Sequence, residues 1–242
     1  MTATPPPARI GSLYVIPSLL GVVPPAEALP QHTIDVARRL SHFVVETPKI
    51  ARQFLKALDP QRSLSSIAIA ELNEHTAAER IPELLAPALR GYDLGLLTDA
   101  GCPGIADPGA PLVSAAHRAG LRVVPLVGPC AVLLALMASG LNGQAFAFHG
   151  YLPAKPSPRH EALRGVELAA ASGVTQIFIE TPYRNDAMIA AVLAASRPTL
   201  RFCVAADLTL PTEHVVSRTI AAWRAAARVA LGKRPAIFLL GL

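Results

Sequence analysis

The sequence predicts an α/β fold with largely parallel sheets. Short apolar runs alternate with longer amphipathic segments along the chain, which is the order expected of strands connected by helices. The apolar runs of the first half are continuous rather than alternating, as expected for strands covered by helices on both faces. With 242 residues, 52% hydrophobic and 16% charged, the chain fits one large domain or two small ones and is not a disordered protein.

The short apolar runs predict ten strands, and the longer segments predict eight helices. We expect strands at residues 13–17, 43–46, 67–72, 94–98, 123–126, 146–150, 176–180, 202–206, 215–217 and 237–240. We expect helices at residues 30–40, 50–58, 77–89, 111–120, 131–140, 160–171, 185–195 and 220–230. Residues 131–138 are the most apolar stretch, but they fall far short of the ~20 residues of a membrane span and predict a buried helix.

Composition changes at residues 150–159, where three prolines exclude a helix and predict a loop. This loop follows an expected domain boundary near Asn142, which gives an N-terminal domain over 12–142 and a C-terminal domain over 143–242. Residues 1–11 are rich in proline and are expected to be a disordered tail without a signal peptide.

Charge and cysteine content restrict the partners only weakly. The formal net charge of +5 permits contact with nucleic acid, but a genome whose base composition favours arginine is the preferred explanation of this charge. Cys102, Cys130 and Cys203 form no C-x-x-C pair, so we expect no disulfide framework and a reducing, cytoplasmic location. The histidines lack metal-ligand spacing and the serines lack a G-x-S-x-G elbow, so neither a metal site nor a hydrolase triad is supported.

In open α/β sheets, ligands bind beyond the carboxyl ends of the strands, so the loops there are the first candidates. The loop over residues 97–109 has three glycines that allow close approach of a ligand, and its Asp99 and Asp107 can accept hydrogen bonds from one. The alternative is an ordinary turn in which Asp107 caps the next helix. The loop has neither Gly-Lys-Ser/Thr nor G-x-G-x-x-G, which disfavours a P-loop or a dinucleotide fingerprint.

Three further strand ends carry weaker signals. Residues 127–132 lead into a helix whose free N–H groups suit a carboxylate, although a plain helix start explains them as well. Glu180 and Arg184 are a charged pair, for which a structural salt bridge is the alternative. Glu74 and His75 suit acid–base work, but neighbours on a strand face opposite ways, and a surface turn is the alternative.

Taken together, these loops resemble one family. The segments are Thr-Asp-Ala-Gly-Cys-Pro at 98–103 with Asp-Pro-Gly at 107–109, Val-Gly-Pro-Cys-Ala at 127–131, Phe-His-Gly-Tyr-Leu-Pro-Ala-Lys at 148–155 and Glu-Thr-Pro-Tyr-Arg at 180–184. In order and spacing, roughly residues 13–240 resemble the tetrapyrrole methylase superfamily of S-adenosylmethionine-dependent methyltransferases. The most similar branch is the bacterial small-subunit ribosomal RNA ribose 2′-O-methyltransferases of the RsmI type, which Asn-Glu-His at 73–75 also fits.

The resemblance implies two α/β domains, with a largely parallel sheet in the first, a mixed sheet in the second and a ligand cleft between them. It also implies a homodimer that binds S-adenosylmethionine, yields S-adenosylhomocysteine and uses no metal. The residues implied for cofactor binding are Pro17, Asp99, Ala100, Gly101, Pro103, Ile105, Gly128, Pro129, Cys130, Ala131, Val132, Glu180, Tyr183, Arg234, Pro235 and Ala236. Lys49, Lys155 and Arg184 are candidates to hold acceptor phosphates.

A ribose 2′-hydroxyl acceptor benefits from a general base, and the candidates are Glu46, Asp99 and Glu180. The chain departs from the RNA branch at several places where a substrate is expected. Residues 16–21 lack the branch's Asn-Leu-x-Asp, residues 46–49 read Glu-Thr-Pro-Lys in place of Glu-Asp-Thr-Arg, residues 206–208 lack Arg-Glu-Leu, and no C-terminal helical piece follows Leu242. A shorter sister group is therefore expected. Methyl transfer to ribosomal RNA is the first hypothesis, and its alternatives are methylation of a tetrapyrrole or other small molecule, or a binding module without catalysis.

Overall fold

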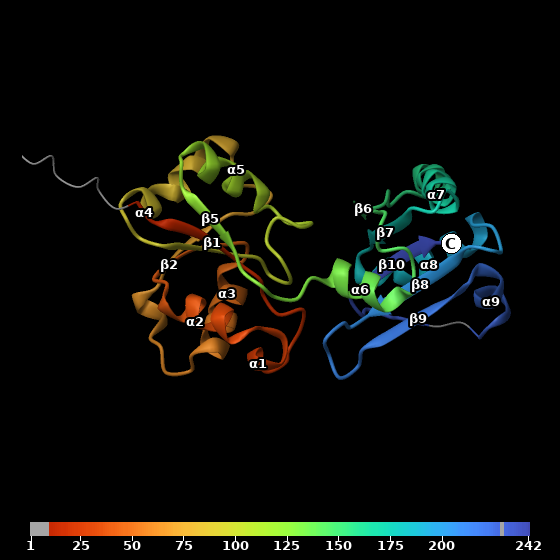
Figure 1. The fold of residues 1–242 in the computed structure, drawn as a ribbon, viewed down its shortest axis with the longest axis horizontal. Coiled ribbons are helices and arrows are strands. Elements are labelled where there is room, and N and C mark those ends of the chain that lie inside the picture. Colours follow the sequence, from red (N-terminus) through yellow and green to blue (C-terminus); the bar gives the residue numbers. More distant parts are fainter. Residues whose placement is uncertain (1–9, 228–229) are drawn as a thin grey trace, which may run out of the picture. The chain divides into compact units, whose positions relative to one another are not determined.

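The computed structural model describes residues 10–227 and 230–242. Residues 1–9 of the expected disordered tail and residues 228–229 of the last expected helix therefore lie outside the described residues. The chain folds as two compact units that divide between Cys130 and Ala131 (Figure 1). The division precedes the helix at 131–139 rather than following it near Asn142, because this helix packs on the second sheet.

The first unit is built on a parallel sheet of five strands in the order β3-β2-β4-β1-β5. The strands are β1 (Ser12–Ile16), β2 (His42–Val45), β3 (Ala68–Glu71), β4 (Leu94–Leu97) and β5 (Arg122–Pro125). The helices are α1 (Pro25–Ala28), α2 (Gln31–Arg39), α3 (Pro48–Leu58), η1 (Leu64–Ser66), η2 (Ala78–Leu85), α4 (Ala86–Leu89) and α5 (Ala110–Arg118), where η marks a 3₁₀ helix.

Both faces of this sheet are buried, which explains the continuous apolar runs. Phe43 and Val45 of β2 pack in a core with α2 and α3, whereas Val44 between them packs in a second core with η2, α4 and α5. Figure 1 shows α2 and α3 on one side of the strands and α5 on the other. Because the strands are parallel, the loops after β1, β2, β4 and β5 all leave the sheet at its carboxyl edge.

The second unit has a mixed sheet of five strands in the order β6-β7-β10-β8-β9. The strands are β6 (Phe146–Tyr151), β7 (Thr175–Ile179), β8 (Arg201–Ala206), β9 (His214–Thr219) and β10 (Ala236–Gly241). The helices are α6 (Ala131–Ser139), α7 (Pro156–Ala171), η3 (Pro182–Arg184), α8 (Asn185–Ala195) and α9 (Ile220–Ala225). Only β6 and β7 pair in parallel, while β10 runs antiparallel to both β7 and β8.

Side chains of the central strands fill the core of this unit. Phe178, Phe202 and Phe238 stack with ring centroids 5.7 and 6.1 Å apart and pack with α7, α8 and α9. The indole N–H of the single tryptophan, Trp223, donates to the carbonyl of Phe202 over 2.7 Å.

The predicted strands all appear, with ends shifted by two residues or fewer, but three helix predictions were wrong in part. The prolines at 150–159 do not exclude a helix, since α7 begins at Pro156 and its first turn has N–H groups without intrahelical partners. The segment 77–89 is a 3₁₀ helix containing Pro82, followed by the short α4, because Pro82 and Pro87 lack the N–H groups that one continuous helix needs.

The third is the segment 220–230, whose helix ends at Ala225. Arg224 and Ala225 are exposed, and after Trp223 no described side chain is buried until Leu231, so no packing holds a longer helix. The four-residue helix α1 had no sequence signal. No helix among the described residues is long and apolar enough to cross a membrane.

Candidate strand-end site

The loops after β1 and β4 are joined at the carboxyl edge of the first sheet. Ser18 donates its N–H to the carbonyl of Gly101 over 2.8 Å and its hydroxyl to the carbonyl of Thr98 over 2.7 Å. Ser18 is buried, and with Gly101 it forms an isolated antiparallel bridge. Residues 16–21, which depart from the family pattern, are therefore still connected by hydrogen bonds to the loop over residues 97–109, which we call the glycine loop.

The loop after β2 meets the same segment through two carboxylates. Glu46 Oε2 accepts from the Thr98 hydroxyl at 2.8 Å and from the Asp99 N–H at 3.1 Å. Asp99 accepts in turn from Thr47, with the N–H at 3.1 Å from Oδ1 and the hydroxyl at 2.8 Å from Oδ2. We call Ser18, Glu46, Thr47, Thr98 and Asp99 the strand-end site.

The electrostatics of the strand-end site raise the pKa of Asp99. Burial raises the pKa of Asp99 above 3.8, the Thr47 hydroxyl opposes the rise and the nearby Glu46 carboxylate adds to it. A carboxylate whose pKa is raised is a stronger base than an ordinary one, and such groups gather at functional sites.

The loop after β5 closes the edge from the other side. The Cys102 thiol donates to the carbonyl of Pro129 over 3.4 Å and is hydrogen-bonded to the Cys130 thiol, a bond that, with burial, raises the pKa of Cys102. A Cβ on Gly128 would lie 2.9 Å from Cγ of Pro17, so glycine is required there by the approach of the β1 loop.

The glycine loop has its own internal support. Gly101 and Gly104 have φ values of 76° and 84°, which favour glycine. Asp107 Oδ1 accepts from the N–H groups of Gly104 at 2.5 Å and Gly109 at 2.8 Å. Asp107 therefore stabilises the turn before α5, which agrees with the alternative of an ordinary turn. Asp99, in contrast, lies at a cavity.

That cavity has a volume of about 500 Å³ within the first unit. It is lined by residues 18–23 of the β1 loop, by Ile50, Gln53, Phe54 and Ala57 of α3, and by Asp99 and Ala100. Its walls are largely apolar, and among the described residues that line it Asp99 is the one carboxylate. A hydrogen-bond donor that enters this cavity would meet the Asp99 carboxylate in largely apolar surroundings.

In the second unit, Glu180 follows β7 and its side chain is fully buried. Its Oε1 accepts from Arg184 at 2.6 and 2.9 Å and from the Thr181 N–H at 2.7 Å. Burial raises the pKa of Glu180, but the hydrogen bonds from Arg184 and Thr181 outweigh it, so the net pKa lies below 4.5. Glu180 and Arg184 thus form a salt bridge, as the alternative hypothesis of a structural role predicts.

The other carboxylate oxygen of Glu180, Oε2, is buried without a hydrogen-bond partner among the described residues. An unpaired buried acceptor is costly, so this oxygen is suited to receive a donor from a ligand or a water molecule. Asn185 at the start of α8 is also fully buried, and its Nδ2 donates to the carbonyl of Arg234 over 2.7 Å. Asp186 Oδ1 accepts from the Leu231 N–H at 3.1 Å, so the start of α8 holds the segment before β10.

The structure places the remaining predicted residues in different settings. Arg234 is committed to Asp207, with Nε 2.6 Å from Oδ2, and donates to the carbonyl of Thr212. Lys49, near the start of α3, and Lys155, before α7, are exposed. The glycine-loop and β5-loop residues lie together within the first unit, which brings together Pro17, Asp99, Ala100, Gly101, Pro103, Ile105, Gly128, Pro129 and Cys130.

The sequence did not single out Ser18, Thr47, Asn185 or Asp207. Thr47 occupies the position of a family aspartate, and that substitution was the available signal for it. The contacts of Ser18 and Asn185 join segments about 50 to 80 residues apart, which no local pattern reveals.

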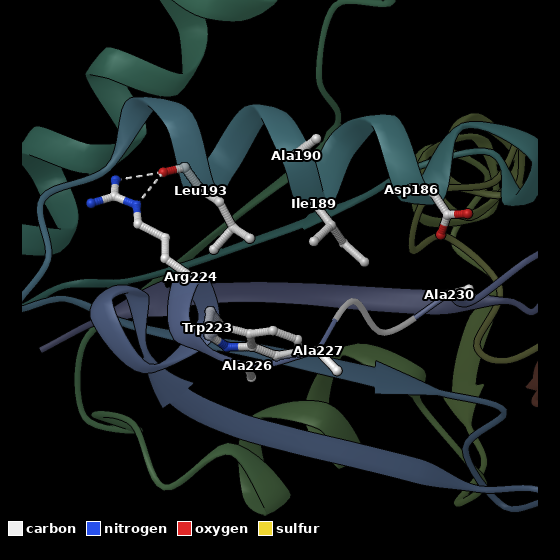
Figure 2. A pocket seen from close by; sticks show the side chains of 9 residues that line it. All are labelled: Asp186, Ile189, Ala190, Leu193, Trp223, Arg224, Ala226, Ala227 and Ala230. Carbon is white, nitrogen blue, oxygen red and sulfur yellow. Dashed lines mark hydrogen bonds between the residues drawn. The ribbon is translucent and has the colours of Figure 1, made fainter.

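In two further cavities, the polar side chains are mostly bound to other protein groups or exposed to solvent. Figure 2 shows one of about 540 Å³ between α8 and α9, in which the Arg224 guanidinium donates to the carbonyl of Leu193. Its polar groups, Asp186 and Arg224, are both bound to backbone. The other, of about 330 Å³, is lined by Glu71, His75 and Arg80 among others, and Glu71 Oε1 accepts from Asn73 Nδ2 at 2.6 Å. Glu74, which lies 3.6 Å from His75, is mostly exposed, as in a surface turn. Among the described residues, no group of three or more His, Cys, Asp and Glu side chains is placed to hold a metal ion.

Residues 27–223 match the family model of the tetrapyrrole (corrin/porphyrin) methylases. The chain belongs to the tetrapyrrole methylase family. It is 37% identical over 172 residues to ribosomal RNA small subunit methyltransferase I of Vibrio cholerae, 35% over 190 residues to that of Escherichia coli O157:H7 and 36% over 212 residues to that of Xylella fastidiosa. Within the tetrapyrrole methylases, the chain thus belongs to the branch of these relatives.

These alignments cover 71%, 77% and 87% of this chain, but 56%, 63% and 73% of the respective relatives. The chain therefore spans less than two thirds of the length of the first two. Solved tetrapyrrole methylases share its fold: the methyltransferase CobJ aligns with a TM-score of 0.64 at 16% identity, over 96% of this chain and 94% of that one. A uroporphyrin-III C-methyltransferase from Thermus thermophilus complexed with S-adenosylhomocysteine aligns with a TM-score of 0.56 at 20% identity, over 96% and 97%.

Proposed function

We propose that the protein is an S-adenosylmethionine-dependent methyltransferase that acts on small-subunit ribosomal RNA at a ribose 2′-hydroxyl. Membership of the tetrapyrrole methylase family and the names of the relatives support the cofactor and the RNA acceptor. The observation that carries the proposal is the strand-end site, where Asp99, with a raised pKa, borders a cavity at the carboxyl edge of a parallel sheet.

The residues of the first unit fit a cofactor of this kind. The loop at 99–105 and the turn at 128–130 lie together at one sheet edge, with glycines that allow close backbone approach. In the second unit, the unpartnered Glu180 Oε2 offers a buried acceptor for a ligand N–H or O–H group. We also propose residues 131–132 and 234–236 as cofactor-binding residues. Asn185 positions Arg234 through the hydrogen bond to its carbonyl.

When bound, S-adenosylmethionine supplies a methyl carbon that an acceptor oxygen attacks in line with the carbon–sulfur bond, whose electron pair stays on sulfur. The protein then has to align the acceptor and take its proton. Of the three candidate bases, Asp99 fits this role, because it is partly exposed at the cavity and its pKa is raised. Glu180 is a weaker base, because its hydrogen bonds with Arg184 and Thr181 lower its pKa. Glu46 Oε2 already accepts hydrogen bonds from the Thr98 hydroxyl and the Asp99 N–H.

The first experiment is a calorimetric titration of the protein with S-adenosylhomocysteine. Micromolar binding at about one site per chain supports the proposal, and no binding at millimolar ligand contradicts it. Methyl transfer from labelled cofactor is then compared on small ribosomal subunits, on total RNA and on a uroporphyrinogen. Turnover on the subunits alone, with the label in a nucleoside 2′-O-methyl group, is the expected result, and turnover on the tetrapyrrole alone contradicts the RNA acceptor.

The role of Asp99 is tested with Asp99→Asn. For a general base, kcat falls about 10²- to 10⁴-fold while the affinity for S-adenosylhomocysteine stays within about threefold. An equal loss of cofactor affinity instead makes Asp99 a cofactor ligand. We extend the proposal to a homodimer in the cytoplasm. Sedimentation of the purified chain at two concentrations tests the dimer, and a monomer throughout contradicts it.

A further inference from the structure

Two exposed tyrosines lie at the carboxyl ends of neighbouring parallel strands in the second unit. Tyr151 ends β6, where it is 58% exposed and stands opposite Ile179 of β7. Tyr183 follows β7 in the turn η3 and is 70% exposed. Large aromatic side chains are expensive to leave in water, so two of them at one sheet edge point to a binding surface.

An irregularity in the backbone of β6 precedes Tyr151. The pairing of β6 with β7 shifts register between Phe148 and Tyr151, and Gly150 within the shift has a φ of 63°. A bulge of this kind turns the following side chain away from the regular strand direction.

Cationic groups accompany the two rings. The Arg184 guanidinium lies 5.2 Å from the centre of the Tyr183 ring. The hydrogen bond with Glu180 is the main cause that raises the pKa of Arg184, and electrostatic interaction with Tyr183 and Tyr151 adds to the rise. Arg184 uses Nε and Nη2 for Glu180, whereas its Nη1 has, among the described residues, only a long 3.4 Å contact with the Tyr183 hydroxyl.

Lys155 follows Tyr151 by four residues and begins a basic stretch. Residues 155–164 contain Lys155, Arg159 and Arg164 against the single carboxylate of Glu161. The Lys155 ammonium group is exposed and has no hydrogen bond or ion pair with the described residues, whereas the Lys155 carbonyl accepts from the Arg159 N–H in α7.

We propose that Tyr151 and Tyr183 stack on unpaired bases of the RNA substrate while Arg184 and Lys155 contact its phosphates. This inference rests on the proposed function and specifies the form of RNA that is recognised. It assigns Tyr183 to the RNA in place of the cofactor contact that the family resemblance implied. Flat rings beside cations are the combination that binds single-stranded nucleic acid, because every base has a face to stack and every nucleotide has a phosphate. In a duplex the base faces are covered, so the tyrosines find no partner there.

The test uses the full chain and a fluorescein-labelled RNA of twelve nucleotides, either single-stranded or annealed to its complement. We expect the wild type to prefer the single strand. Tyr151→Leu and Tyr183→Leu should each weaken single-strand binding about 5- to 150-fold, whereas Tyr151→Phe and Tyr183→Phe, which keep the ring, should stay within about twofold. Lys155→Gln should lower the slope of log affinity against log salt by about 0.7, the value for one phosphate contact.

Tyr92→Leu is the matched control. Tyr92 is 51% exposed in the first unit, where its ring contacts His42, and it should not affect RNA binding. Because all three tyrosines are exposed, the leucine variants should fold, and the intrinsic fluorescence of Trp223 checks this for the second unit.

Binding of S-adenosylhomocysteine separates this inference from the proposed function. Weaker RNA binding with unchanged cofactor affinity supports the inference. If Tyr183→Leu weakens the cofactor instead of the RNA, the ring stacks on adenine and the inference is overturned. If the wild type binds the cofactor but the leucine variants bind RNA normally, or if duplex RNA binds as tightly as the single strand, the inference fails while the proposed function stands.

Discussion

The hydroxyl of Thr47 donates to Asp99 Oδ2 over 2.8 Å, although 52 positions separate the two residues in the chain. This bond joins the loop after β2 to the loop after β4, and the Thr47 N–H reinforces it at the other carboxylate oxygen. Thr47 thus stabilises the ionised form of a carboxylate that burial and Glu46 destabilise.

Replacing Thr47 with valine tests this relationship, since valine keeps the shape and the backbone N–H but lacks the hydroxyl. We expect a loss of about 1 kcal/mol of stability and a further rise in the pKa of Asp99. The acidic limb of the pH–rate profile should move to higher pH. Thr47→Ser, which retains the hydroxyl, is the control and should leave that limb in place. A limb that is the same in both variants argues against the hydrogen bond.

Asp99→Asn should stabilise the folded protein at neutral pH. A carboxyl with a folded-state pKa raised above 3.8 contributes stability at pH values below 3.8, and this contribution is lost as pH rises through the folded-state pKa. The neutral amide avoids that loss, so we expect the melting temperature at pH 7 to rise by about 1–3 °C and the difference to vanish near pH 3. Calorimetry across this pH range makes the comparison, and a destabilised variant at pH 7 contradicts the raised pKa.

Gly128→Ala should disturb the strand-end loops. The new Cβ would press on the Pro17 ring, which costs about 1–3 kcal/mol and displaces the β1 and β5 loops. We expect a lower melting temperature together with at least tenfold weaker binding of S-adenosylhomocysteine. Gly165→Ala in α7 is the matched control, because no atom apart from the adjoining backbone of α7 lies within 4 Å of its added Cβ, and helix propensity should stabilise it by about 0.5–1 kcal/mol. Equal effects of the two substitutions would contradict this account.

The Glu180–Arg184 pair should make the second unit sensitive to acid. The pKa of Glu180 lies below 4.5 in the folded state, so its stabilising contribution is present above pH 4.5 and is lost as pH falls through the folded-state pKa. Glu180→Gln should cost about 2–4 kcal/mol at pH 7, with a smaller difference from the wild type below pH 4. Urea unfolding followed by Trp223 fluorescence measures this unit.

The control for Glu180→Gln is Glu167→Gln, in the same unit. Glu167 pairs with Arg197, which is 48% exposed, so we expect a loss of less than about 1 kcal/mol. If both glutamine variants lose the same stability at all pH values, the buried pair has no special role.

The strands could be predicted because burial on both sides leaves a continuous apolar run, as in Phe43, Val44 and Val45. The start of α7 could not be predicted from the presence of proline alone, since proline breaks a helix interior but is tolerated in its first turn. Pro156 and Pro158 belong to that first turn.

The candidate site could be predicted only as a set of loops. The sequence named Asp99 and Glu46 as candidate bases, but the division of roles between them follows from contacts across the fold. The same holds for Arg234, whose commitment to Asp207 depends on a turn in which Asp207 has a φ of 51°. A positive φ at a residue other than glycine has no reliable sequence signal.

The division of the chain between Cys130 and Ala131 falls inside the Gly-Pro-Cys-Ala segment that the family resemblance singled out. Recombination between two related genes at this point would therefore cut the segment and pair the turn of one parent with the helix of the other. Chimeras that exchange residues 1–130 should therefore require compatible residues on the two sides of this junction. Crossovers recovered in a shuffled library should consequently cluster away from residues 127–132.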